Sequence, residues 1–140
     1  MNKKNKLAKA FSTSFNSVER VYALLKFLST CQSSMNLCER SQVNHMIFDN
    51  VKAIYEDQEA RLGGNHYLRC LLCLSLVFDL SNGKKTKEIS ERTIARRTLK
   101  ELDNQFLHDG MHYEISPGYH RLMLMDILDY VQLCKDKNSL

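Results

Sequence analysis

Two short polar clusters interrupt the otherwise helical pattern of this 140-residue chain. One is Gly63–Tyr67, with the sequence GGNHY, and the other is His108–His120, with the sequence HDGMHYEISPGYH. Histidine, tyrosine and glutamate side chains can accept or donate a proton, and asparagine and histidine can donate hydrogen bonds to an anion. Loops held on a rigid scaffold often carry such chemistry. The sequence therefore indicates a candidate site built from these two clusters.

The elements that must position the clusters are helices. Five segments have the apolar spacing or the unbroken apolar character of helices, and short turns separate them, so we predict an all-α fold of antiparallel hairpins. The predicted helices are Val18–Thr30 with Ser17 as its N-cap, Ser41–Leu62 ended by Gly63-Gly64, His66–Leu80 capped by Asn65, Thr86–Leu107, and a last helix that Ser116-Pro117 opens and that frays from Cys134.

One helix differs in kind, because His66–Leu80 is apolar nearly all round and is therefore predicted to lie among the others. The residues predicted to point inward from the remaining helices are Val18, Val21, Tyr22, Leu25 and Leu28; Val43, Ile47, Val51, Ile54 and Tyr55; Ile89, Ala95, Leu99, Leu102 and Phe106; and Leu122, Met125, Leu128 and Val131. Residues 1–15 are predicted to be a basic flexible leader, 16–134 a helical domain and 135–140 a frayed tail.

In an antiparallel array, the third and fifth helices can run in the same direction and begin at the same end of the bundle. That arrangement would bring Asn65 and His66 near Tyr119 and His120. We therefore predict one groove that is shared by the two helix starts.

The same residues carry a resemblance to a known family. The segments GNHYLRCLLCLSLVF and ELDNQFLHDGMHYEISPGYHRLMLMDILDYVQL resemble the heparinase II/III family of polysaccharide lyases, which includes related alginate lyases. The similarity runs roughly from Ser17 to Leu133. The motifs GNHYL, DGxHYExSPxYH and LxLMDILDY are specific when they occur in this order and at this separation.

The resemblance implies an (α/α) toroid followed by an antiparallel β-sheet domain, and β-elimination at the uronic acids of acidic glycans. It implies that Asn65 and His66 contact the substrate carboxylate and that Tyr119 is the catalytic tyrosine. His120, His112, Tyr113 and Glu114 would bind substrate. The chain matches a central part of such a toroid, without the β-sheet domain and a further catalytic histidine. We therefore expect an incomplete lyase that is inactive alone or needs a completing chain.

β-Elimination needs these residue types. Removal of the C5 proton of a uronate places charge on a carboxylate that is already anionic, so an asparagine amide and a histidine must stabilise it. A tyrosine can then take the proton as phenolate or protonate the leaving oxygen as phenol. Tyr119 lies in the first turn of a predicted helix, where the helix dipole favours an anion.

Each candidate residue has a structural alternative. Asn65 could simply cap its helix, and an amide oxygen used for capping leaves only the NH₂ group for substrate. Tyr119 could pack its ring on the core with its hydroxyl in water. His112 and Tyr113 could anchor the loop, and Glu114 could hold a histidine. For the whole chain, the alternative function is a non-catalytic module that binds acidic glycans or assists assembly in surface polysaccharide metabolism.

We predict no metal and no cofactor. The four histidines of the two clusters, His66, His108, His112 and His120, lack the short fixed spacing of a zinc site. Cys70 and Cys73 form a CxxC pair, but they lie in an apolar helix without a second pair, so we expect small buried hydrophobes with reduced thiols.

The partner that the family resemblance implies is an acidic, uronate-containing polysaccharide. A formal charge of +4 suits an anionic ligand, but no helix-turn-helix signature supports nucleic acid as a partner. The longest apolar run is too short to cross a membrane, and the basic start lacks the apolar core of a signal peptide. We therefore expect a cytoplasmic protein, although the family resemblance would allow the periplasm. Exposed apolar faces on the first and last helices would favour self-association or a completing chain.

Overall fold

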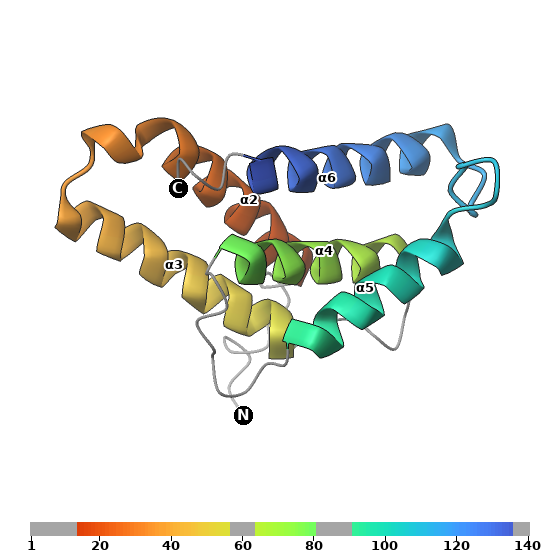
Figure 1. Ribbon diagram of the computed structural model, residues 1–140, viewed down its shortest axis with the longest axis horizontal. Helices are drawn as coiled ribbons and strands as arrows, with labels where there is room; N and C mark the ends of the chain where they lie inside the picture. The colour runs from red at the N-terminus through yellow and green to blue at the C-terminus, as the bar shows by residue number, and fades with distance from the viewer. Residues whose placement is uncertain (1–13, 57–63, 81–90, 136–140) are drawn as a thin grey trace, which may run out of the picture.

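The computed structural model describes residues 14–56, 64–80 and 91–135. In these ranges the protein is all-α, as predicted, and contains no strand beyond the isolated bridge between Phe106 and His112. The helices are α2 (Ser14–Cys31), α3 (Leu37–Glu56), α4 (Gly64–Leu80), α5 (Glu91–Gln105) and α6 (Pro117–Lys135), with the 3-10 turn η1 (Gln32–Ser34) after α2 (Figure 1). The likeness to an incomplete toroid remains a prediction.

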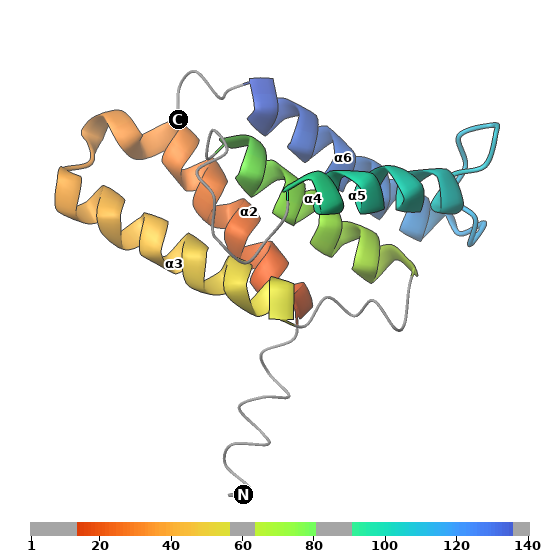
Figure 2. The same cartoon turned by 60° about the horizontal axis from the view of Figure 1, so that its bottom comes forward.

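Helix α4 lies at the centre of the molecule. It packs against α2, α3, α5 and α6 (Figure 2), and most of its residues are buried on every side. This confirms the prediction that the helix with apolar residues all round is surrounded by the others. Cys70 and Cys73 are buried thiols that form no disulfide bond, and burial raises the pKa of the Cys73 thiol. The packing interpretation of the CxxC pair is therefore confirmed.

Helices α2 and α3 form the hairpin that the sequence predicts. All five apolar residues predicted for the inner face of α2 are buried, and Ile47, Val51 and Ile54 of α3 are buried too. Ser17 is not an N-cap, because α2 begins three residues earlier, at Ser14, and Ser17 lies buried inside the helix.

Helix α3 begins at Leu37, four residues before the predicted start, because a capping box precedes it. The backbone N–H of Glu39 donates to Oδ1 of Asn36 at 2.9 Å, and the backbone N–H of Asn36 donates to Oε2 of Glu39 at 2.9 Å. Each side chain satisfies a backbone donor of the first turn that has no partner within the helix. The N-x-x-E spacing of Asn36 and Glu39 is a sequence signal that we did not use.

The predicted inner face of α5 is correct only in part, because Leu102 and Phe106 pack against the core but other predicted positions do not. Ala95 and Leu99 are exposed, and the buried positions are Ile94, Thr98 and Gln105. Both polar residues of this face make hydrogen bonds to α4, with Ser75 and with the carbonyl of Gly64. These bonds offset the cost of burying the polar side chains.

The predicted inner face of α6 is wrong at three of its four positions, while Leu122 is half-buried. Met125, Leu128 and Val131 are exposed, whereas Met123, Asp126 and Leu133 are buried. Asp126 is buried because it pairs with Arg69 of α4. The exposed residues leave an apolar stripe on the outer surface of α6, so self-association or a completing chain remains a prediction.

Helices α4 and α6 run in the same direction and begin at the same end, while α5, which packs on α4, runs in the opposite direction (Figures 1 and 2). This confirms the predicted topology, in which the two helix starts share one end of the bundle. Ser116 and Pro117 open α6 as predicted, because the carbonyl of Ser116 accepts the first intrahelical bond, from the N–H of His120, at 2.9 Å.

Several predictions lie outside the described residues. These are the leader before Ser14, the end of the second helix at Leu62 and its stop at Gly63, the start of the fourth helix at Thr86 with Ile89, and the tail after Lys135.

Candidate functional site

The segment 106–116, which joins α5 to α6, is a closed turn held by its own backbone. The N–H of Leu107 donates to the carbonyl of Met111 at 2.8 Å, and the N–H of Tyr113 donates to the carbonyl of Gln105 at 2.8 Å. Gly110 takes a φ of 84° at the tip, a conformation that costs glycine little. The turn therefore returns the chain to the end of α5 before α6 begins.

His112 lies at the centre of this turn and is fully buried. The N–H of Glu114 donates to its Nδ1 at 3.4 Å, which leaves the proton on Nε2, 3.3 Å from Oε1 of Gln105. Burial lowers the pKa of His112, and neighbouring His120 lowers it further, while Glu114 opposes both. The imidazole is therefore held neutral, and its burial favours the loop-anchor alternative over direct contact with a substrate.

His120 completes this contact between the turn and α6. Its Nδ1 accepts a hydrogen bond from the backbone N–H of His112 at 3.3 Å. The ring of Phe106 stands edge-on to both imidazoles, with centroid separations of 5.7 Å to His112 and 6.5 Å to His120. The turn is therefore fixed to the first turn of α6, next to Tyr119.

Gln105 fixes the turn to the start of α4. Its Nε2 donates to the carbonyl of Gly64 at 2.8 Å, while its Oε1 faces His112. Gly64 has a φ of 70°, and a Cβ at this position would lie 3.4 Å from the hydroxyl oxygen of Tyr113. The two polar clusters of the sequence therefore touch, through Gly64 on one side and Gln105 and Tyr113 on the other.

Asn65 and His66 follow Gly64 in the first turn of α4. Asn65 is only 7% exposed, and its Oδ1 accepts the backbone N–H of His66 at 2.8 Å. The predicted N-cap position is wrong by one residue, since the helix already begins at Gly64, but the amide still accepts a backbone donor there. Its NH₂ group is what remains for a ligand. His66 is exposed.

Tyr119 occupies the first turn of α6, where the positive end of the helix dipole favours an anion. Its side chain is 45% exposed, and its hydroxyl makes no hydrogen bond to the residues that the structure describes. The phenol is therefore accessible from solvent and available to a ligand.

Tyr113 is a poorer candidate for a base. Its hydroxyl donates to Oε1 of Glu114 at 3.3 Å, and partial burial together with the Glu114 charge raises the pKa of the phenol. Such a group stays protonated at neutral pH. The contrast supports the preference for Tyr119 as the catalytic tyrosine.

The backbone is strained directly before α6. Ile115 has a φ of 51°, in the left-handed region that β-branched residues avoid, and its side chain is exposed. Its N–H donates to the carbonyl of His112 at 3.0 Å. The surrounding bonds hold this conformation in place, as is common near binding sites.

A buried ion pair lies one turn further along α4. Arg69 is 4% exposed, and its Nε lies 2.5 Å from Oδ2 of buried Asp126 in α6. Its Nη2 lies 2.5 Å from Oε1 of Glu19 in α2. Burial raises the pKa of Asp126, and the Arg69 guanidinium offsets part of that rise. Arg69 therefore ties α4 to two helices, a role that sequence reasoning missed.

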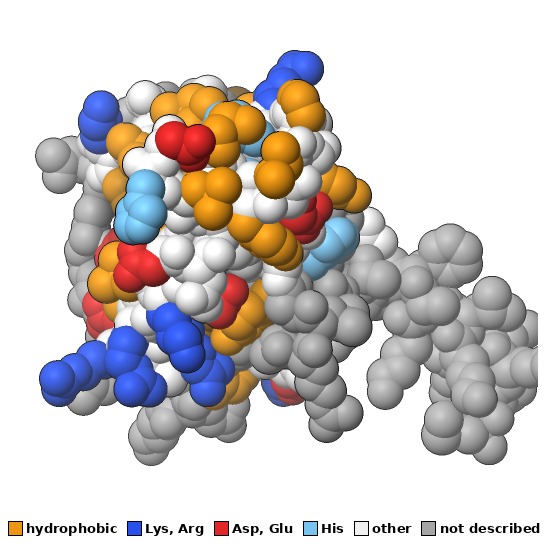
Figure 3. Space-filling view, turned by 90° about the vertical axis from the view of Figure 1, so that its right-hand side faces the viewer, with side chains coloured by type: hydrophobic (Ala, Val, Ile, Leu, Met, Phe, Trp, Pro, Cys, Tyr) orange, Lys and Arg blue, Asp and Glu red, His pale blue; other side chains and the backbone are white. Residues whose placement is uncertain are grey.

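The end of the molecule that carries the two helix starts is mixed in character. Figure 3 shows hydrophobic, acidic and histidine side chains side by side on this end, with Lys and Arg side chains along its lower edge. Along α5 the exposed cations are Arg92, Arg96, Arg97 and Lys100. An anion could therefore be attracted to α5 as well as to the helix starts.

Within the described ranges, no group of three or more histidine, cysteine or acidic side chains is placed to hold a metal ion. Among the described helices, none combines the length and the apolar character that a membrane crossing requires.

A family model described as heparinase II/III N-terminus matches residues 80–140. This segment is heparinase II/III-like. The match confirms the resemblance seen in the motifs for the part of the chain that includes α5, the turn and α6. The heparinase II/III-like segment carries Tyr113, Glu114, Tyr119 and His120, whereas Asn65 and His66 precede it. Searches of curated proteins and of solved structures gave no match.

Proposed function

We propose that the end of the molecule at which α4 and α6 begin binds a uronate of an acidic glycan. In this proposal, the chain contributes this end as the uronate site of a polysaccharide lyase that acts by β-elimination. One observation carries the proposal. Gln105 binds the carbonyl of Gly64 and Tyr113 lies beside this glycine, so that the GNHYL motif and the DGxHYExSPxYH motif lie at one end. The heparinase II/III-like segment supports a polysaccharide as the ligand.

In this proposal Tyr119 is the catalytic residue. Its phenolate takes the C5 proton of the uronate, the electron pair of that C–H bond forms the C4–C5 double bond, and the C4–O bond breaks. The leaving oxygen takes a proton, which the Tyr119 phenol can return. The free, exposed hydroxyl in the first turn of α6 suits this role.

Asn65 and His66 stabilise the charge that develops on the carboxylate. The NH₂ group of Asn65 remains for this role once its Oδ1 has accepted the His66 N–H. Donors that are already fixed cost little reorganisation when the charge develops. His120, Tyr113 and Glu114 bind neighbouring sugar hydroxyls, and buried His112 shapes the turn.

A second candidate is binding of an acidic glycan without turnover. The observation that favours it is Asn65, whose amide is nearly buried and whose oxygen is already used by the backbone. This function needs neither a phenolate nor a proton transfer, so it is insensitive to removal of the Tyr119 hydroxyl.

The test is release of unsaturated uronate product, followed by the absorbance of its double bond, on alginate, heparin and hyaluronan. We expect turnover when the chain is supplemented with a completing chain, and under that condition a loss of at least about a hundredfold in Tyr119→Phe, the scale of a lost general base. Tyr113→Phe removes a hydroxyl that binds substrate but transfers no proton, so it should lower the activity far less than Tyr119→Phe. Turnover that survives in Tyr119→Phe, or no turnover on any uronate polymer even with a completing chain, contradicts the lyase proposal.

A further inference from the structure

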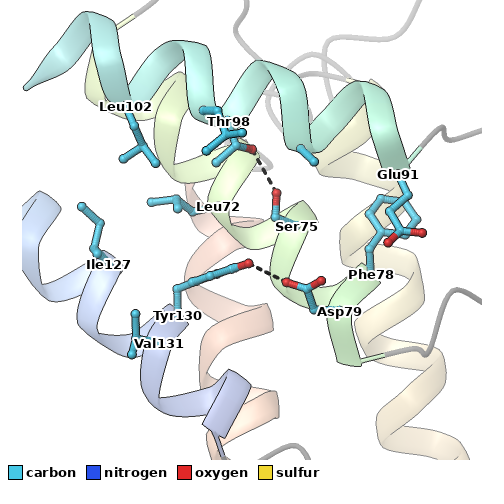
Figure 4. Close-up of a pocket in the computed structure, with 12 residues that line it drawn as sticks. Leu72, Ser75, Phe78, Asp79, Glu91, Thr98, Leu102, Ile127, Tyr130 and Val131 are labelled. Atoms are coloured by element: carbon cyan, nitrogen blue, oxygen red, sulfur yellow. Dashed lines mark hydrogen bonds between the residues drawn. The ribbon is translucent and has the colours of Figure 1, made fainter.

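A cavity of about 350 Å³ lies between α4, α5 and α6, beside the second half of α4 (Figure 4). None of the residues proposed to act on a glycan lines it. Its walls are mainly apolar, with Leu72, Phe78, Leu102 and Ile127 among them, and its volume is within the range of small-molecule sites. Leu99, at 65% exposure, is part of the lining, so the cavity opens to the surface at α5.

The hydroxyl groups around the cavity already have partners. The hydroxyls of Ser75 and Thr98 share a hydrogen bond of 2.9 Å, and Thr98 also donates to the carbonyl of Ile94 at 3.0 Å. The Tyr130 hydroxyl donates to Oδ2 of Asp79 at 2.5 Å, as Figure 4 shows. A ligand therefore meets few free hydrogen-bond donors here.

The cavity provides hydrogen-bond acceptors and negative charge. Two carboxylates, Asp79 and Glu91, are among its lining residues, and no lysine, arginine or histidine is among those that the structure describes there. The Asp79 carboxylate is only partly exposed. An anionic ligand would be repelled, and a neutral one would leave the carboxylates without a charged donor.

We propose that this cavity binds a small arylalkyl amine, with its ring between α4, α5 and α6 and its ammonium group on Asp79. The protonated amine supplies the donors and the positive charge that the lining lacks. The rings of Phe78 and Tyr130 provide apolar and cation–π contacts for a ligand of this shape. This site is separate from the proposed glycan site and does not depend on it.

The experiment compares 2-phenylethylamine, 2-phenylethanol and 3-phenylpropanoate, which share a ring and a two-carbon linker but differ in charge. Binding to the full chain is followed by amide NMR shifts of residues in α4, α5 and α6. We expect the amine to bind about tenfold more tightly than the alcohol, as for one added hydrogen bond to a charged group, and the acid to bind more weakly still.

Two variants locate the site. Asp79→Asn keeps an acceptor for the Tyr130 hydroxyl but removes the charge, so the amine should lose about tenfold while the alcohol is unchanged. Ala95→Leu adds bulk at an exposed lining position and should weaken all three ligands without unfolding the protein. Asp103→Asn, an exposed carboxylate of α5 outside the cavity, is the matched control and should change nothing.

Preferential binding of the amine that depends on Asp79 supports the proposal. Three ligands of equal affinity, tighter binding of the acid, or shifts that are unaffected by Ala95→Leu overturn it. Absence of binding by all three, with the fold intact by circular dichroism, overturns it as well.

Discussion

The two halves of α4 are joined to their neighbours in different ways. In the first half, Gly64 and Arg69 are held by polar contacts to α5, to α2 and to Asp126 of α6. In the second half, Ser75 and Asp79 also make hydrogen bonds to α5 and α6, but the contacts are mainly apolar and surround a cavity of about 350 Å³. The polar contacts of the first half fix the positions of side chains, and the packing of the second half leaves an open cavity.

The difference between the two halves of α4 indicates where charge stabilisation and where binding of an apolar ligand can occur. Charge stabilisation requires donors that are already in place, which the first half of α4 and the turn 106–116 provide. Accommodation of an apolar ligand requires volume, which the second half provides. We therefore expect polar substitutions in the first half to cost much more stability than those in the second.

The largest effect is expected for Arg69→Met. Removal of the guanidinium leaves Asp126 buried without its cation, which costs about 3–5 kcal/mol. The free energy of unfolding in urea measures this loss. The double variant Arg69→Met with Asp126→Leu should regain most of the stability, because it leaves no buried charge. A loss below about 1 kcal/mol in the single variant would show that the first half does not depend on this pair.

A smaller loss is expected for Gln105→Ala. The substitution leaves the carbonyl of Gly64 and the Nε2 proton of His112 without their partner, at a cost of about 1–3 kcal/mol. Amide hydrogen exchange should also become faster at Tyr113, whose N–H bonds to the backbone of residue 105. Gln42→Ala, at an exposed position of α3, is the control. Unchanged exchange in the turn would mean that the two polar clusters are held together by other contacts.

The first half should also be sensitive to acid. Because burial lowers the pKa of His112 in the folded state, the unfolded chain binds more protons as the pH falls below about 6.5. Stability contributed by neutral His112 is present above that pH and is lost as the pH falls. His112→Asn should flatten the decline of the free energy of unfolding between pH 7 and pH 5. His45→Asn, an exposed histidine of α3, should leave the decline as it is.

The smallest effect is expected in the second half, for Ser75→Ala. Thr98 keeps its bond to the carbonyl of Ile94 after the Ser75 hydroxyl is removed, so the cost should not exceed about 1 kcal/mol. Urea denaturation compares it directly with Gln105→Ala. Should Ser75→Ala prove the more costly of the two, the contrast between the halves of α4 would be wrong.

The same contrast explains what the sequence could predict. The α2 and α3 faces and the central position of α4 were predictable, because their burial follows apolar periodicity. The inner faces of α5 and α6 were not, because Thr98, Gln105 and Asp126 are buried through partners that lie far along the chain. A prediction from apolar periodicity assigns such polar residues to the exposed face.

The candidate site was predictable in its location but not in its contacts. The antiparallel arrangement predicted for the helices placed both polar clusters at one end, and the structure has them there. Gln105, which joins the clusters, carries no motif and was missed. The only sequence feature that indicates its role is that it lies on the same helical face as Ile94 and Thr98. That feature is informative only once this face is known to be buried.

The most direct test of the account is an NMR titration of the full chain with a short uronate oligosaccharide. We predict that the amide shifts concentrate at the starts of α4 and α6, including Asn65, His66, Tyr119 and His120, and that Tyr119→Phe alters this pattern locally. Shifts confined to the exposed cations of α5, or no shifts at all, would contradict the claim that the two helix starts form a glycan site.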